Sequence, residues 1–320
     1  MKIGVFTAVF GQQTLEQTLD YIAESGLEAV EFPTGNYSEC CHIFPDQLID
    51  NTSAQKDLLK AVESRGLTIS ALSCHGNPLH PNKEIAKEHH ETHRKSVILA
   101  EQLGVDVVVT FSGCPGDGPD AKAPNWVTCA WPPDFSDLAK WQWDEVMIPY
   151  WKAEAKFAQE HKVKYAFEPH PGFCVYNVET MLRIHEICGD AIGCNFDPSH
   201  LFWNGVDACA AIRALGDVIY YVHAKDCRVD PYNTGINGCN DYKPYGDVLE
   251  RSWVFRTVGY GHDAQTWNDI ISTLKAVGYD SVISIEHEDS LMSATEGFQK
   301  AVSFLKEAVI KEQAGGMWWL

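Results

Sequence analysis

Eight short apolar runs alternate with eight helix-like stretches along almost the whole chain, and no other feature of the sequence limits the fold as strongly. The runs are rich in β-branched and aromatic residues, and the stretches between them have the apolar spacing of amphipathic helices. Several of these stretches end in glycine, which commonly caps a helix where the chain turns back into a strand. The runs that we expect to form strands are KIGVFTA, AVEFPTG, TISALSCH, DVVVTFSG, KYAFEPH, IGCNFDPSH, VIYYVHAKD and DSVISIEHE.

Eight strand–helix units predict an α/β protein in which residues 1–320 form a single (β/α)8 TIM barrel. An open doubly wound sheet is the alternative, but no GxGxxG follows the first strand, and polar residues collect at the ends of many strands rather than at one crevice. Two long loops follow the fourth and seventh strands, from Gly113 to Asp137 and from Cys227 to about His262. Because active sites of such barrels lie at strand C-termini, we expect these loops to form walls or lids over a pocket.

The composition argues against several classes of protein. With 25 Lys and Arg against 44 Asp and Glu, the formal net charge is -19, which disfavours binding to nucleic acid and to anionic membrane surfaces. No run approaches the roughly 18 apolar residues of a membrane span, and MKIGVFTAVFG at the start is typical of a strand rather than a signal peptide. Eleven scattered cysteines without a CxxC pair fit reduced thiols, so we expect a cytoplasmic protein.

Four candidate metal ligands stand at the ends of the last four predicted strands. Glu168 follows YAF, Asp197 follows CNF, His223 follows YYV and Glu286 follows ISI. Taken singly, each has an ordinary explanation, such as a helix cap or a hydrogen-bonded core histidine. On consecutive strands of a barrel, however, all four point into one mouth. Three carboxylates and one imidazole suit Mn²⁺, Mg²⁺, Co²⁺ or Zn²⁺, and a divalent cation lets the crowded carboxylates stay ionised.

At these residues the sequence resembles the sugar phosphate isomerase/epimerase family, whose members have the xylose isomerase-like TIM barrel. The resemblance covers most of the chain and is carried by FEPHPGFCVYN, NFDPSHLFW, YVHAKD, FRTVGYGHD and ISIEHED. It implies one divalent metal ion, with Mn²⁺ as the first expectation, held by Glu168, Asp197, His223 and Glu286. It also implies that Glu168 and Glu286 are the catalytic acid and base.

A second group of residues is expected to meet the substrate. The resemblance implies that His200 binds substrate and that Arg228 contacts substrate hydroxyls, while Lys225 in the H-x-K-D element is expected to support the site. Other residues at or beyond strand ends are candidates for sugar contacts, against the alternatives that the histidines satisfy backbone carbonyls and that the tryptophans are packing residues. These candidates are His75, His170, Trp126, Trp131 and Trp203.

A metal and two glutamates predict an enzyme that removes a proton from a carbon next to a carbonyl. Epimerisation, aldose–ketose isomerisation and elimination all begin with this step, and the sequence leaves the three outcomes open. HEDSLMS after the eighth strand is not the glycine-rich loop that usually binds phosphate in barrels. We therefore expect a small-molecule carbohydrate substrate, namely a non-phosphorylated sugar, keto-sugar or glycoside. The alternative function is that of a 3-oxo-glycoside lyase or C-glycoside deglycosidase catalytic subunit.

Two other functions fit the same fold. One is a metal-cluster endonuclease, which the negative charge disfavours, and the other is a non-catalytic sugar-binding barrel, which would need no acid–base pair.

The sequence also makes structural predictions for two further segments. HHETHR, with His89, His90 and His93, lies in a long polar helical pattern and is expected on a solvated face. The tail GGMWWL is expected to pack on the barrel or on a neighbouring molecule, since exposing each large apolar side chain costs about 1.5–3 kcal/mol. The tail therefore predicts a homo-oligomer, and the resemblance to relatives that cleave 3-oxo-glycosides implies a small partner subunit as the other expected partner.

Overall fold

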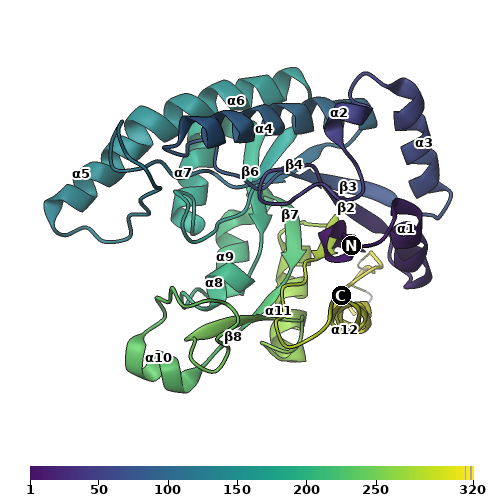
Figure 1. Cartoon of the computed structure of the whole chain (residues 1–320). Coiled ribbons are helices and arrows are strands. Elements are labelled where there is room, and N and C mark those ends of the chain that lie inside the picture. Colours follow the sequence, from purple (N-terminus) through teal and green to yellow (C-terminus); the bar gives the residue numbers. More distant parts are fainter. Residues whose placement is uncertain (314, 318) are drawn as a thin grey trace.

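Parallel strands close into a barrel in this computed structural model, which describes residues 1–313, 315–317 and 319–320 (Figure 1). The strands follow one another around the barrel in the order β1-β10-β7-β6-β5-β4-β3-β2. Each of the eight predicted runs contains one of them, so the predicted (β/α)8 barrel is confirmed. The barrel strands are β1 (Lys2–Phe6), β2 (Ala29–Pro33), β3 (Thr68–Ser73), β4 (Val107–Thr110), β5 (Lys164–Phe167), β6 (Ile192–Phe196), β7 (Ile219–Ala224) and β10 (Val282–Ile285).

Helices flank the barrel and connect its strands. Gly104 ends the longest of them with a φ of 71°, the left-handed conformation that a glycine cap adopts without strain. The α-helices are α1 (Leu15–Glu24), α2 (Pro45–Leu48), α3 (Thr52–Glu63), α4 (Lys83–Leu103), α5 (Pro133–Trp141), α6 (Ile148–Glu160), α7 (Val178–Cys188), α8 (Ser199–Phe202), α9 (Ala208–Leu215), α10 (Pro231–Asn237), α11 (Ala264–Ala276) and α12 (Ala294–Ala308). The other helical segments are η1 (Thr7–Phe10), the π-helical η2 (Gln142–Met147), η3 (Gly189–Ala191) and η4 (Gly216–Val218).

The first long loop is shorter than predicted, because α5 begins at Pro133, inside the range expected to be irregular. Its conformation is held by Gln142, whose buried side chain donates to the carbonyl oxygens of Pro115, Gly116 and Asn125 at 2.8–3.3 Å. Three hydrogen bonds from one side chain fix the loop against the start of η2, so it is an ordered wall of the barrel mouth.

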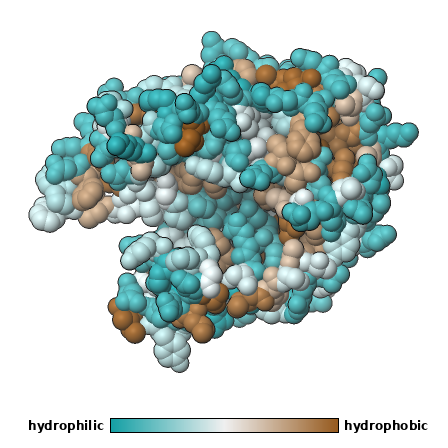
Figure 2. Space-filling view, viewed as in Figure 1, coloured by the Kyte–Doolittle hydropathy of each residue, from teal (hydrophilic) through white to brown (hydrophobic). Residues whose placement is uncertain are grey.

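The second long loop contains regular structure that the sequence did not predict. The strands β8 (Asp226–Val229) and β9 (Trp253–Arg256) form an antiparallel ribbon, and α10 lies between them. The guanidinium of Arg251, only 2% exposed, lies 4.4 Å from the ring centre of Tyr245 and 4.7 Å from that of Trp253. Figure 2 shows a hollow between the segment that carries α5 and the segment that carries α10, and its floor is hydrophilic.

Inside the barrel, an apolar layer lies below a polar layer. The apolar cluster contains small residues such as Ala29, Ala71 and Ala166, together with the larger Tyr221. Because side chains on one face of a strand recur every second residue, the next inward positions follow two residues later. There β2 carries Glu31 and β7 carries His223. The apolar layer closes the barrel interior, and the polar layer above it forms the base of the C-terminal mouth.

The prediction for HHETHR was wrong, because α4 turns two of its histidines inward. His93 is fully buried, and its Nε2 donates to the carbonyl oxygen of Cys74 at 3.1 Å. His89 is 7% exposed and accepts a hydrogen bond from the backbone N–H of Asn77, in the loop that follows β3. Residues four apart share one helix face, so both rings belong to the stripe of α4 that packs on the barrel.

Stability at mildly acidic pH is expected to depend on His93. Burial, followed by the neighbouring His89, lowers the pKa of His93 to about 3, so below pH 6.5 the unfolded chain binds a proton that the folded chain does not. This linkage removes about 1.4 kcal/mol of stability for each pH unit below 6.5. We expect wild-type protein to lose roughly 2 kcal/mol more than His93→Gln between pH 7.5 and pH 5, measured by urea unfolding. Equal losses in both proteins would contradict this expectation.

Apolar residues of the tail are exposed in this single chain, and the packing of the tail on the barrel or on a neighbouring molecule stays a prediction. Met317 is 64% exposed and Leu320 is 93% exposed, while Trp318 lies outside the described residues. None of the helices in the described ranges is long and apolar enough to cross a lipid bilayer.

Candidate metal centre and active site

Four strands bring the predicted ligands together at the C-terminal mouth. Glu168, Asp197 and Glu286 directly follow β5, β6 and β10, and His223 lies in β7. One ligand atom from each residue lies within 4.8 Å of the others. Glu168, Asp197 and His223 are at most 1% exposed, and the side chain of Glu286 is 11% exposed. The strand ends of the barrel therefore form the cluster that the sequence predicted.

Glu168 is the most heavily engaged carboxylate of the cluster. Its oxygens lie 3.0 Å from His200 Nε2, 3.0 Å from His223 Nδ1 and 3.4 Å from His75 Nε2. Asn195 donates from Nδ2 to Glu168 Oε2 at 2.8 Å. Burial by itself raises the pKa of a carboxyl group, but the three histidines outweigh it and hold the pKa of Glu168 well below its usual range. Glu168 is thus ionised.

Lys225 forms ion pairs with three further carboxylates at the mouth. Its buried Nζ lies 2.7 Å from Glu286 Oε2, 3.2 Å from Asp197 Oδ2 and 3.3 Å from Glu288 Oε2. Burial raises the pKa of Glu286, but the charges of Lys225 and His223 outweigh it and bring the pKa below its usual range. The ammonium group of Lys225 therefore favours the ionised form of Glu286.

The cluster fits one divalent cation. Metal bonds of about 2.1 Å place ligand atoms roughly 3–4 Å apart around an ion. The separations of 3.0 Å between Glu168 and His223 and of 3.2 Å between His223 and Glu286 match that spacing. Asp197 Oδ2 is buried and accepts no hydrogen bond from the residues that the structure describes. It forms ion pairs with Lys225 Nζ at 3.2 Å and His200 Nε2 at 3.3 Å, and the lone pairs that no hydrogen bond uses can bind a metal ion. Oxygen and imidazole donors suit Mn²⁺, Mg²⁺, Co²⁺ or Zn²⁺.

Three further histidines surround Glu168. The ring centres of His170 and His200 are 4.1 Å apart, and His75 is held by a 2.9 Å hydrogen bond between Nδ1 and Ser38 Oγ. His170 Nδ1 donates to the carbonyl oxygen of Pro171 at 2.7 Å, so this nitrogen satisfies a backbone carbonyl rather than being free to contact a sugar. Burial and the charge of Lys225 lower the pKa of His200, but Asp197 and Glu168 outweigh them and raise it to about 9.

These histidines also extend the set of possible donors. His75, Glu168 and His223 form a second group with the spacing of metal ligands, and Glu168, His170 and His200 form a third. Glu168 is common to all three groups, whereas three carboxylates meet only in the group that the sequence predicted.

The remaining candidates have different surroundings. Arg228 is exposed on β8, and no hydrogen bond or ion pair joins it to the cluster within the described ranges. Trp126 is half-buried with its ring 5.5 Å from that of Tyr176, and Trp131 is 75% exposed. Trp203 is a packing residue, since its buried ring stacks on Trp253 at 4.8 Å.

Two residues that the sequence analysis missed contact the predicted ligands. Glu31 on β2 is fully buried and lies 3.0 Å from His223 Nε2. Asn195 on β6 donates to Glu168 and lies 3.1 Å from His223 Nδ1. The signal for Glu31 was present, because a glutamate interrupts the otherwise apolar strand AVEFP, where every residue is buried.

Asp226 fixes the ribbon that borders the mouth. Its two carboxylate oxygens accept hydrogen bonds of 2.8–3.1 Å from backbone and side-chain donors of the ribbon and of the segment before α11. Gly261 is required here, because a Cβ would lie 2.3 Å from the carbonyl oxygen of Cys227. The donors are the backbone N–H groups of Cys227, Gly259, Gly261 and His262, together with His262 Nδ1 and Trp267 Nε1.

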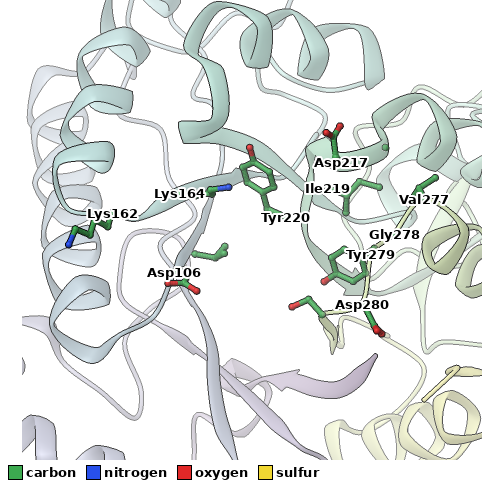
Figure 3. Close-up of a pocket in the computed structure, with 13 residues that line it drawn as sticks. Asp106, Lys162, Lys164, Asp217, Ile219, Tyr220, Val277, Gly278, Tyr279 and Asp280 are labelled. Atoms are coloured by element: carbon green, nitrogen blue, oxygen red, sulfur yellow. The ribbon is translucent and has the colours of Figure 1, made fainter. Parts of the chain in front are cut away.

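A separate pocket of about 550 Å³ lies at the opposite end of the barrel (Figure 3). It is lined by the first residues of several strands, among them Val107 of β4, Lys164 of β5 and Ile219 of β7. Lys164 Nζ lies 4.4 Å from the ring centre of Tyr220. The N-terminal end of a TIM barrel serves stability rather than catalysis, and the predicted ligands do not line this pocket, so the candidate active site is the one at the C-terminal mouth.

Comparison with known proteins agrees with this architecture. A family model described as xylose isomerase-like TIM barrel matches residues 19–308. YfiH, an uncharacterized protein of Bacillus subtilis (strain 168), is 39% identical over 312 residues, which cover 97% of this chain and 99% of the relative.

Solved structures share the fold at lower identity. The probable 3-DHS dehydratase AsbF from Bacillus anthracis has a TM-score of 0.66 and 16% identity, with 96% of this chain and 99% of that chain covered. The IolI protein with a bound zinc atom has a TM-score of 0.64 and 18% identity, with 98% and 100% covered. An L-ribulose 3-epimerase has a TM-score of 0.62 and 17% identity, with 96% and 94% covered. The family model and the close relative together show that this protein belongs to the xylose isomerase-like TIM barrel family.

Proposed function

We propose that the protein is a divalent-metal-dependent sugar isomerase or epimerase that acts on a non-phosphorylated sugar, keto-sugar or glycoside. The observation that carries this proposal is the meeting of Glu168, Asp197, His223 and Glu286 within 4.8 Å at the barrel mouth. A divalent ion at this position supplies positive charge that stabilises the anion formed when a proton leaves a carbon next to a carbonyl.

Within this proposal, Glu168 and Glu286 carry the proton. They come from β5 and β10, which are separated around the barrel by β6 and β7, so they approach a bound substrate from different directions. One carboxylate removes the proton from the substrate carbon and, now a carboxylic acid, can return it to the neighbouring carbon, which gives isomerisation. Epimerisation requires the other carboxylate to take up a proton from solvent first and to deliver it to the opposite face. Glu286, with its side chain 11% exposed against 2% for Glu168, has the more open position.

The charges at the mouth favour a substrate without phosphate. The segment after β10 carries Glu286, Glu288 and Asp289, and Lys225 is already surrounded by carboxylates. A phosphate dianion would therefore meet more negative than positive charge. Carbohydrate hydroxyls suit the site better, since His75, His170 and His200 offer ring nitrogens and the floor of the hollow is hydrophilic (Figure 2). The likeness to an L-ribulose 3-epimerase and to zinc-bound IolI supports a metal-dependent sugar enzyme.

Elimination from a 3-oxo-glycoside is the second candidate function, and one pocket favours it. A pocket of about 500 Å³ is lined by Trp126 and Tyr176 together with Cys174. Cys174 and Tyr176 belong to the segment that follows Glu168, so this pocket borders the loop of a predicted catalytic residue. Its aromatic walls are suited to the planar aglycone of a glycoside. The likeness to a probable dehydratase is consistent with elimination chemistry on this fold.

Incubation with substrates in D₂O tests the proposal and separates the two functions. Protein loaded with Mn²⁺ or Zn²⁺ is mixed with free ketoses, inososes and 3-oxo-glucosides, and the products are followed by NMR. We expect deuterium at a carbon next to a carbonyl, with a new epimer or isomer as the product. Release of an aglycone would select the lyase. Protein treated with a chelator is the control, and equal exchange in that control, or no exchange with any compound, would contradict the proposal.

A further inference from the structure

We propose that Glu31 is a positioning residue of the metal centre, which fixes the ring of His223 so that Nδ1 faces the other ligands. The inference rests on the proposed metal-dependent function. It concerns a side chain that lies on β2, on the opposite side of His223 from the cluster.

The two nitrogens of His223 face different partners. Nε2 lies 3.0 and 3.1 Å from the two oxygens of Glu31. Nδ1 lies 3.0 Å from Glu168 Oε2 and 3.2 Å from Glu286 Oε2. A carboxylate can only accept a hydrogen bond, so Nε2 carries a proton toward Glu31, whereas Nδ1 lies 3.1 Å from the amide donor Asn195 Nδ2 and is the nitrogen that can accept. Nδ1 is then the nitrogen whose lone pair can bind a metal, and the negative partner strengthens it as a ligand.

Glu31 is itself held in place from two neighbouring strands. Ser284 Oγ on β10 donates to Glu31 Oε2 at 2.6 Å, and Ser73 Oγ on β3 donates to Oε1. Because both oxygens accept hydrogen bonds from serines, the Glu31 carboxylate is held in one orientation. Its contact with Nε2 then holds the ring of His223 in one orientation as well. The arrangement is a chain of hydrogen bonds that begins on the strands and ends at the metal site.

The negative charge of Glu31 forms no second ion pair in the described part of the chain. The side chain is fully buried, and within the described ranges His223 is its only ion-pair partner. Burying a carboxylate without a lysine or arginine is costly. A purely structural link between strands could be made by a neutral amide, so the negative charge itself points to the ring that it contacts.

Cobalt binding to metal-free protein tests this role independently of turnover. Co²⁺ affinity is measured by competition with a chromophoric chelator, and the visible spectrum reports the ligands around the ion. We expect Glu31→Gln to bind Co²⁺ about 10- to 100-fold more weakly than the wild type, the usual effect of removing a carboxylate behind a histidine ligand. Glu154→Gln is the matched control, because Glu154 is 2% exposed and pairs with Arg94 between α4 and α6. We expect this variant to lose stability but keep its Co²⁺ affinity.

A double-mutant cycle separates positioning from a general effect of charge. If Glu31 acts through His223, the Glu31→Gln change has less than about a threefold effect in a His223→Asn background. An equal loss in both backgrounds, or a single variant that binds Co²⁺ as the wild type does, would overturn the inference.

Ser284→Ala is the second variant, for the case that Glu31→Gln does not fold. It keeps the carboxylate but frees one of its oxygens, and we expect severalfold weaker Co²⁺ binding with an altered spectrum. Unchanged binding would count against the inference. If wild-type protein bound neither Co²⁺ nor Mn²⁺, the proposed function and this inference would both fall, whereas normal wild-type binding with indifferent variants would remove only the role of Glu31.

Discussion

Glu286→Gln is expected to lower kcat by about three orders of magnitude, which corresponds to roughly 4 kcal/mol of lost transition-state stabilisation. The change removes the group proposed to carry a proton and replaces it with an amide that cannot do so. It also removes a negative ligand that lies 3.2 Å from His223 Nδ1. The measurement is the initial rate of deuterium exchange or product formation at saturating metal, so that weaker metal binding does not account for the loss.

Glu288→Gln is the matched control for this variant. Glu288 contacts the same Lys225 at 3.3 Å, but its side chain is 49% exposed and it is not among the clustered ligands. We expect its kcat to stay within about threefold of the wild type, because Glu288 contacts Lys225 from the exposed side and Glu286 and Asp197 still pair with the ammonium group. Turnover that survives the Glu286→Gln change would remove this residue from the proposed acid–base pair.

Removal of divalent metal is expected to abolish turnover and to lower the melting temperature by roughly 5–10 °C. An ion at a concentration about 1,000 times its Kd stabilises the folded state by about 4 kcal/mol, and each kcal/mol is worth roughly 2 °C in a chain of this size. The physical reason is the repulsion between buried carboxylates that only Lys225 and nearby histidines offset. The measurement is calorimetry and activity after chelation, followed by addition of Mn²⁺, Zn²⁺, Co²⁺ or Mg²⁺ in turn.

Asp197→Asn serves as the control for this experiment. We expect the melting temperature of the variant to respond little to added metal, because the amide keeps the shape of Asp197 but loses the charge of the buried Oδ2. Full activity in protein shown by elemental analysis to be free of divalent metal would contradict both the ligand set and the proposed mechanism.

The strands of the barrel could be predicted from sequence because local patterns determine them. Each apolar run after the first is preceded by an amphipathic helix, and glycine at Gly104 closes α4 in the left-handed conformation that the pattern predicts. The ribbon of β8 and β9 could not be recognised in the same way. Its two strands are separated by α10 and by a loop that is fixed by tertiary contacts such as those of Arg251, so no short turn in the sequence marks them as partners.

The candidate site was predicted where side chains follow strand ends, and missed where they lie deeper in the barrel. Glu168 and Glu286 stand directly after apolar runs, so their position in the sequence points to the mouth. Glu31 and Asn195 lie within strands, and their roles depend on which strands become neighbours across the barrel, which only the closed fold defines. His89 and His93 show the related difficulty that a polar helix can turn individual polar side chains inward.

The hydrogen bonds that Asp226 accepts have a consequence for the kinetics of substrate entry. They tie the ribbon beside the mouth to the start of α11 before any ligand arrives. A rim that is already ordered loses little conformational entropy when a sugar binds. We therefore expect association to be governed by diffusion into an open vestibule rather than by a gating motion of this segment, and the rate of capture to rise in proportion to ligand concentration without saturating.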